Sequence, residues 1–125
     1  MSEQLISGWG RVGVVGQQIS SDDLFGLTRN VSLCRGLGRS YGDSSLPASP
    51  GKRVACTTLA DRLLHFDPSN GRLRVESGVS LRSLVRLLLP RGWFVPVTPG
   101  TSDVTVGGMV AADVHGKNHH IDGCF

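Results

Sequence analysis

The sequence predicts an α+β fold, a small sheet with two or three helices. Short apolar stretches of strand character alternate with turn residues, and one later stretch has the period of an amphipathic helix. The 17 glycines are concentrated in two segments rather than spread evenly. A hydrophobic fraction of 39% is enough for a core, and no internal repeat or linker divides the 125 residues. We therefore expect one α+β unit.

The first half of the chain predicts few regular elements. Residues 5–16 are rich in glycine and predict an irregular lead-in, and Ser20 or Ser21 is expected to cap a short helix that opens with two aspartates. A short strand over 31–34 runs into the first glycine segment. After a loop rich in proline and serine, a second strand is expected over 54–59.

The second half has clearer signals. Strands over 63–67 and 73–76 are joined by Pro-Ser-Asn-Gly, a turn sequence that ends in a residue tolerant of positive φ. Ser80 is a good helix N-cap, and Pro90 with Gly92 ends that helix. The helix has one apolar face, made of Leu81, Leu84, Val85 and Leu88. A strand over 93–97 and a last helix, starting near Asp103 or Thr105 and running to Ala112, complete the expectation.

The first glycine segment has the chemistry of an anion-binding loop. It reads Arg-Gly-Leu-Gly-Arg-Ser-Tyr-Gly-Asp over residues 35–43. Glycines allow tight turns that leave backbone N–H groups uncovered, and consecutive uncovered N–H groups form a nest for a phosphate. The alternative is an ordinary glycine-rich surface turn, and the spacing alone does not decide between them. The spacing is neither the dinucleotide fingerprint nor a Walker loop.

The second glycine segment, residues 99–116, has the same character. Hydroxyl residues precede Gly107 and Gly108, which fall in the first turn of the last expected helix. Glycine is unfavourable inside a helix by about 1 kcal/mol relative to alanine, so the pair indicates a close approach to the backbone. The approaching group is either a ligand phosphate at the helix N-terminus or a neighbouring strand.

The composition gives no indication of a nucleic-acid-binding, membrane-spanning or secreted protein. The net charge of +3 is spread thinly, without the basic run typical of nucleic-acid binders. No apolar run approaches the roughly 20 residues that span a bilayer. Three widely spaced cysteines indicate reduced thiols, and no secretory signal is visible at the amino terminus. We expect a cytoplasmic protein, with association with the inner membrane face through a lipid-linked substrate as the alternative.

Three motifs together resemble the FAD-binding domain of vanillyl-alcohol-oxidase-type (PCMH-type) enzymes, and within it the decaprenylphosphoryl-β-D-ribose oxidase group. They are Gly-Trp-Gly-Arg at 8–11, the loop at 35–43, and the stretch from Pro-Gly-Thr at 99–101 to His-Gly-Lys-Asn-His-His at 115–120. The resemblance implies that residues 1–125 are the first lobe, the amino-terminal part of such a domain. The remainder of the domain and the substrate domain are expected to lie outside this chain.

The resemblance also implies cofactor contacts. The FAD pyrophosphate would lie against the loop made of Arg35, Gly36, Leu37, Gly38, Arg39, Ser40, Tyr41, Gly42 and Asp43. The cofactor would pass along Gly100, Thr101, Thr105, Val106, Gly107 and Gly108. The flavin or its ribityl chain would meet Ala112, Asp113, Val114 and His115. No catalytic residue is assignable, and His115 is the candidate beside the flavin.

Two departures from some relatives imply that FAD is held without a covalent bond. Those relatives tether the flavin through a histidine in the pyrophosphate loop, where this chain has Arg39, or through a cysteine before the double glycine, where residues 101–104 have none. The expected function is the FAD-binding part of an oxidoreductase acting on a CH–OH group of a sugar or polyol. Because substrate-contacting parts would be absent, we expect the isolated chain to be inactive unless a second chain complements it.

Two other functions stay open. The glycine loop alone would also suit a non-enzymatic nucleotide- or anion-binding module. His115, His119 and His120, with Cys124 as an imagined fourth ligand, suggest a metal-binding module. Adjacent histidines point in different directions on most backbones, so we expect no metal.

Overall fold

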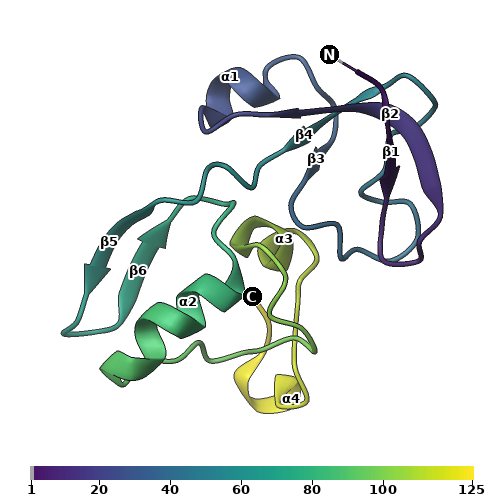
Figure 1. Ribbon diagram of the computed structural model, residues 1–125. Coiled ribbons are helices and arrows are strands. Elements are labelled where there is room, and N and C mark those ends of the chain that lie inside the picture. The colour runs from purple at the N-terminus through teal and green to yellow at the C-terminus, as the bar shows by residue number, and fades with distance from the viewer. Residues whose placement is uncertain (1) are drawn as a thin grey trace. The chain divides into compact units, whose positions relative to one another are not determined.

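The computed structural model describes residues 2–125 and divides into two units, Met1–Ala60 and Asp61–Phe125. Figure 1 shows a sheet of four strands in the first unit and a hairpin with most of the helices in the second. Over residues 2–125 no helix has the length and apolar character needed to cross a membrane. The α+β class predicted from the sequence is confirmed, with four short α-helices in the described chain instead of two or three.

The amino-terminal unit is built on a mixed sheet in the order β1-β2-β4-β3. Its elements are β1 (Gln4–Ser7), β2 (Gly13–Ser20), α1 (Leu24–Thr28), β3 (Cys34–Arg35) and β4 (Arg53–Cys56). β1 runs antiparallel to β2, while β2, β4 and β3 run parallel. Ile6, Leu46 and Val54 form the buried core of this unit. The sheet therefore places the end of β3, where the first glycine segment begins, beside β4.

The prediction of an irregular lead-in over residues 5–16 is wrong, because most of these residues lie in β1 and β2. The glycines that suggested irregularity allow close packing. A Cβ on Gly13 would lie 2.6 Å from Leu5 Cδ1, and one on Gly16 would lie 2.7 Å from Pro47 Cγ. Glycine is unfavourable in strands unless something approaches the backbone this closely.

Three boundaries in this unit also differ from expectation. The first helix begins at Leu24, and its cap is Asp23, whose carboxylate accepts a hydrogen bond from the Gly26 N–H at 3.1 Å. The predicted strand over 31–34 overlaps β3 only at Cys34, and the strand over 54–59 is β4, which ends at Cys56. Pairing with β4 ends at Arg35, so β3 is only two residues long.

The carboxy-terminal unit begins with the predicted hairpin. Its elements are β5 (Leu63–Asp67), β6 (Arg72–Val75), α2 (Leu81–Leu88), the 3-10 helix η1 (Leu89–Arg91), α3 (Val106–Ala111) and α4 (His119–Asp122). Gly71 has a φ of +74°, as the turn sequence predicts. The turn is tightened by Asp67, whose pKa is lowered by hydrogen bonds from Ser69 and Asn70.

Helix α2 agrees with the sequence at both ends. Ser80 Oγ accepts from the Ser83 N–H at 3.1 Å, and Gly92 ends η1 in the left-handed conformation. Buried Leu84 and Leu88 pack with Val79 and with the hairpin, which lies along α2 in Figure 1. Of the four residues of the predicted apolar face, Leu84 and Leu88 belong to this cluster, Leu81 is also buried, and Val85 is only half-buried.

The predicted strand over residues 93–97 is wrong. Within residues 2–125 the segment pairs with no strand. The Trp93 N–H donates to Leu88 O at 3.1 Å, so the chain turns back onto the helix, and Pro96 offers no N–H for a ladder. The Trp93 ring meets Phe66 edge-on with a centroid distance of 5.8 Å. Within this segment Trp93 packs against the core cluster and Val97 is buried, whereas Phe94 is exposed.

The Ser80 cap gives a first testable prediction. Ser80→Ala removes the acceptor for the Ser83 N–H, and we expect the free energy of unfolding to fall by about 1 kcal/mol. Urea unfolding followed by circular dichroism measures the change. Ser32→Ala, at an exposed serine, is the control. Equal stability of the two variants would contradict a stabilising cap.

Candidate functional site: the glycine loop and a hollow at residues 98–119

We define the glycine loop as residues 36–45, which follow β3 directly. Gly38 and Gly42 have φ values of +69° and +61°, the left-handed region in which glycine is favoured. Gly38 is buried, whereas Arg39 and residues 41–44 are exposed. The two glycines therefore bend a loop that presents its middle to solvent.

The backbone of the glycine loop has an unusual hydrogen-bond pattern. Its carbonyls at Leu37, Tyr41 and Asp43 accept bonds from within the loop or from Leu46. By contrast, over the described residues 2–125 no N–H of residues 37–45 donates a hydrogen bond to another protein group. A run of uncommitted N–H groups in a turning backbone is the arrangement that binds phosphate oxygens.

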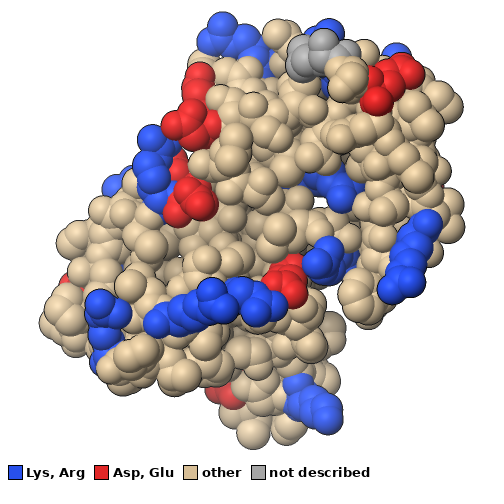
Figure 2. Space-filling model, in the orientation of Figure 1, with Lys and Arg blue, Asp and Glu red and all other residues tan. Residues whose placement is uncertain are grey.

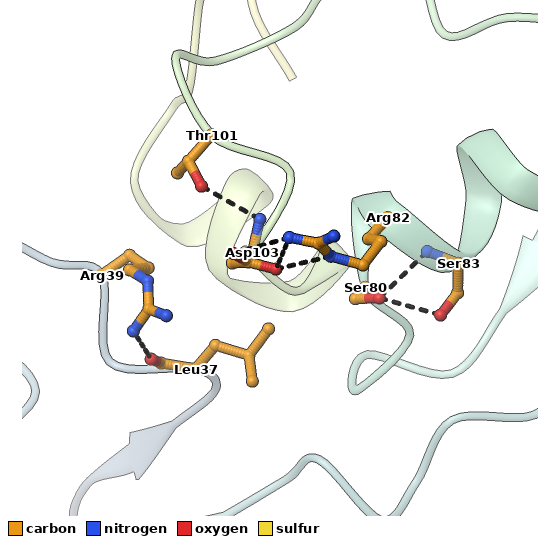
Figure 3. Close-up of polar contacts among 7 residues, drawn as sticks. All are labelled: Leu37, Arg39, Ser80, Arg82, Ser83, Thr101 and Asp103. Atoms are coloured by element: carbon orange, nitrogen blue, oxygen red, sulfur yellow. Dashed lines mark hydrogen bonds and ion pairs between the residues drawn. The ribbon is translucent and has the colours of Figure 1, made fainter.

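The two arginines of this segment differ in what they do. Arg39 is exposed, and its Nη1 donates to Leu37 O at 2.7 Å, so the side chain bends back along the loop (Figure 3). Arg35 is half-buried, and its guanidinium donates to Ser7 O at 2.9 Å and Ser45 O at 3.2 Å. Burial lowers the pKa of Arg35, although an arginine remains protonated at any physiological pH.

The second glycine segment lies at the start of α3, where Thr105 is the N-cap. The N–H groups there already have protein partners. Val106 donates to Val79 O at 2.8 Å, Gly107 to Ser77 O at 2.9 Å, and Gly108 to Thr105 Oγ1 at 3.1 Å. The amides of this turn thus give no support to phosphate binding at the helix end.

The close approach that the double glycine indicated is made by a protein segment. A Cβ on Gly107 would lie 2.9 Å from Ser77 Cβ. Nearby, Thr101 Oγ1 accepts from the Asp103 N–H at 3.1 Å, and Asp103 forms an ion pair with Arg82 at 2.7 Å (Figure 3). These contacts hold the segment before α3 in place without a ligand.

A hollow of about 690 Å³ lies in the carboxy-terminal unit. It is lined by Thr98, Pro99, Gly100, His115, Gly116, Lys117, Asn118 and His119. Its two walls touch at Gly116, where a Cβ would lie 2.6 Å from Thr98 O. Asn118 Nδ2 joins them again by donating to Pro96 O at 3.1 Å.

The hollow brings together Gly100 and His115, two of the residues expected from the resemblance. It adds Lys117, Asn118 and His119, which were not among the predicted site residues, although they lie in the same six-residue motif as His115. The His115 and His119 rings are 5.1 Å apart between centroids. An ammonium group, two imidazoles and an amide suit a ligand rich in oxygen atoms.

Residues 112–115 follow α3 in a constrained conformation. Asp113 has a φ of +50°, and its carboxylate accepts a hydrogen bond from Cys124 Sγ at 2.8 Å. The Val114 N–H donates to Met109 O, and Val114 O accepts from Phe125 N–H at 2.9 Å. The Asp113 carboxylate is therefore engaged with the thiol in this structure.

The histidines do not gather with other ligands. Over residues 2–125 there is no group of three or more histidine, cysteine, aspartate or glutamate side chains placed to hold a metal ion. His119 Nδ1 lies 3.0 Å from Gly116 O, and Cys124 is bonded to Asp113. The geometry thus gives no support to the metal-binding alternative.

The Cys124–Asp113 pair gives a second prediction. The hydrogen bond and the negative charge of Asp113, together with burial, raise the pKa of the Cys124 thiol. The thiol therefore holds its proton to a higher pH, and the stabilising contact is present at neutral pH and lost as the pH rises through that pKa. Asp113→Asn removes the charge, so we expect faster alkylation of Cys124 by iodoacetamide at pH 8, measured by peptide mass spectrometry.

Cys34 in the same samples is the internal control for this prediction, since it is exposed and lies in the other unit. Its alkylation rate is expected to be equal in both proteins. An unchanged or slower rate at Cys124 in Asp113→Asn would show that the carboxylate does not hold the proton on this thiol.

Figure 2 shows the charged side chains on one face of the chain. Lysines and arginines form small separate groups there, and several lie next to aspartate or glutamate. The glycine loop carries the cationic side chain of Arg39, and the hollow carries that of Lys117.

Comparison with known proteins identifies the family. The profile of the FAD binding domain family matches residues 29–125, which include the glycine loop, α3 and the hollow. The chain belongs to the FAD binding domain family. FAD is accordingly its cofactor, and the PCMH-type fold inferred from the resemblance is confirmed.

Relatives of this FAD-binding domain are longer proteins. The chain is 39% identical to decaprenylphosphoryl-beta-D-ribose oxidase of Mycolicibacterium smegmatis over 96% of its own length and 28% of that protein. It is 34% identical to the Delta(24)-sterol reductase homolog dhcr-24 of Caenorhabditis elegans, over 46% of the chain and 11% of that protein. The chain thus spans about a quarter, or less, of these relatives.

Solved structures agree on the fold. Alkyldihydroxyacetonephosphate synthase, in two crystal forms, superposes on 92% of the chain with TM-scores of 0.72 and 0.73 at 17% identity. The chain covers 24% of the synthase. At this identity the likeness establishes the arrangement of strands and helices shared with the FAD-binding domain.

Proposed function

We propose that this chain is the FAD-binding portion of a flavin-dependent oxidoreductase that acts on a CH–OH group of a sugar or polyol, and that its glycine loop holds the FAD pyrophosphate. The run of uncommitted N–H groups over residues 37–45 carries the proposal. These donors suit the oxygens of a pyrophosphate, and Arg39 adds an exposed positive charge in the same loop.

The proposed substrate class is supported by the relative whose name describes an oxidase of a ribose derivative. Bound FAD supplies the redox chemistry by accepting a hydride, while the protein binds and orients. Within this chain, the hollow offers Lys117, His115 and Asn118 to oxygen atoms of a ligand. We expect turnover to require the remainder of the domain and the substrate domain, supplied by the same polypeptide or by a complementing chain in the cytoplasm.

A fluorescence titration tests cofactor binding. Bound flavin is expected to be quenched as the purified chain is added to FAD, and ADP is expected to compete because it carries the pyrophosphate. Riboflavin, which lacks phosphate, is expected to compete weakly. Absence of quenching at millimolar chain would contradict the proposal, and AMP or ADP binding as tight as FAD would favour a nucleotide-binding module.

The mode of attachment gives a third prediction. By the resemblance, Arg39 takes the place of a histidine that tethers the flavin in some relatives, and an arginine forms no such bond to flavin. Precipitating the FAD-loaded chain with acid is therefore expected to leave all the yellow flavin in the supernatant. Flavin retained in the washed pellet would show covalent attachment and contradict the prediction.

A further inference from the structure

Arg35 connects the two ends of the glycine loop region. Its Nη2 donates to the carbonyl of Ser7, at the end of β1, and its Nη1 donates to the carbonyl of Ser45, at the end of the loop. The main-chain oxygen of Arg35 accepts from Thr57 N–H at 3.0 Å and so continues the β3–β4 pairing. Arg35 thus connects the loop both to β1, through Ser7, and to the end of β4, through Thr57.

The loop is shaped around this guanidinium. Gly38 is buried, and a Cβ there would clash with Arg35 Nη2. On another side, a Cβ on Gly8 would lie 3.3 Å from Gly42 O, so the turn closed by Arg11 N–H and Gly8 O contacts the loop directly. Glycine at both positions permits the close approach.

The charge of Arg35 is not neutralised by the protein. Over residues 2–125 its side chain has hydrogen bonds only to backbone carbonyls and no carboxylate partner. Burial lowers the pKa of this arginine, yet it remains a cation. A half-buried positive charge therefore lies next to a run of free N–H groups, where it raises the potential felt by an anion.

We infer that Arg35 is a positioning residue for the cofactor phosphates: it fixes the glycine loop by holding the Ser7 and Ser45 carbonyls, and it adds uncancelled positive charge without itself being the phosphate ligand. The inference rests on the proposed function in that the anion is the FAD pyrophosphate. It changes the role expected for Arg35 from cofactor contact to support of the amides that make the contact.

The test is a titration of the ¹⁵N-labelled 125-residue chain with ADP, followed by amide NMR signals. Arg35→Lys keeps the charge but cannot hold two carbonyls in a fixed fork. We expect it to raise the Kd for ADP about tenfold, the equivalent of one charge-assisted hydrogen bond. The amide signals of residues 36–45 should also move in the free variant. Arg53→Lys is the matched control, since Arg53 is exposed on β4 and, among the described residues, its side chain bonds only the Gln17 side chain.

Each outcome decides the inference. ADP binding by Arg35→Lys at the affinity of the unaltered chain would overturn it, and so would weaker binding with unmoved loop signals in the free variant. If Arg35→Lys does not fold, the unaltered chain is decisive: ADP should shift the loop amides more than the Arg35 guanidinium signals. A larger guanidinium shift would show direct phosphate contact. Absence of ADP binding would contradict the proposed function. The amide signals of residues 36–45, compared between the unaltered chain and Arg35→Lys without ADP, would still test whether Arg35 fixes the loop.

Discussion

Gly38→Ala is expected to lower the free energy of unfolding of the amino-terminal unit by about 1–3 kcal/mol and to weaken FAD binding at least tenfold. The left-handed φ of +69° is unfavourable for alanine by roughly 1–2 kcal/mol. In addition, the new Cβ would clash with Arg35 Nη2, so the guanidinium must shift, and we expect its bond to Ser7 O to weaken. Urea unfolding and flavin fluorescence titration measure the two effects.

Gly42→Ala is the matched comparison for this variant. It has nearly the same φ, +61°, but a Cβ there meets nothing within 4 Å. The conformational penalty is therefore shared, and the difference in stability between the two variants reports the contact with Arg35. Equal losses of stability would show that the guanidinium moves aside without consequence.

Leu84→Ala is expected to destabilise the carboxy-terminal unit by about 2–5 kcal/mol. Leu84 is 3% exposed and lies between Val79 and Leu88 in the cluster that joins α2 to the β5–β6 hairpin. Truncation leaves a cavity that the surrounding side chains fill only partly. This loss is large against the roughly 5–15 kcal/mol of a typical domain. Trp93 fluorescence during urea unfolding follows it, in a Trp9→Phe background that removes the second tryptophan.

Arg86→Ala provides the control on the same helix. Arg86 is exposed, and alanine is a good helix former, so the stability should change by less than about 0.5 kcal/mol. A loss below 1 kcal/mol for Leu84→Ala would mean that the cluster does not support the unit.

Local signals predicted the β5–β6 hairpin and helix α2 well. Ser80, Gly71 and Gly92 act through their own backbone or the next few residues, so the sequence alone reveals caps and turns. The first half needed contacts between distant residues. Gly13 and Gly16 lie in a strand because Leu5 and Pro47 pack against them, and this information is not local in the sequence.

In the candidate site, too, features set by local sequence could be predicted, and features set by contacts between distant residues could not. The glycine loop could be predicted because free amides and positive φ follow from glycine itself. The occupied amides of α3 could not, because Ser77 and Val79, about 30 residues earlier, supply their partners. The walls of the hollow likewise meet through residues far apart in the sequence, Gly116 against Thr98 and Asn118 against Pro96. The resemblance implied that Arg35 contacts the cofactor, but it could not reveal the two backbone carbonyls that its side chain bonds, which lie 28 and 10 residues away.

The amides at the start of α3 have protein partners, whereas those of the glycine loop have none among the described residues. We therefore expect a phosphate ligand to stabilise the two units unequally. A ligand stabilises the part of a chain to which it binds by RT ln(1 + [L]/Kd), about 2.7 kcal/mol at a hundredfold excess over Kd. The loop belongs to the unit Met1–Ala60, and α3 to the unit Asp61–Phe125. Saturating ADP should therefore raise the melting temperature of the first unit and leave that of the second nearly unchanged, so that a calorimetric trace separates into two transitions as the nucleotide is added.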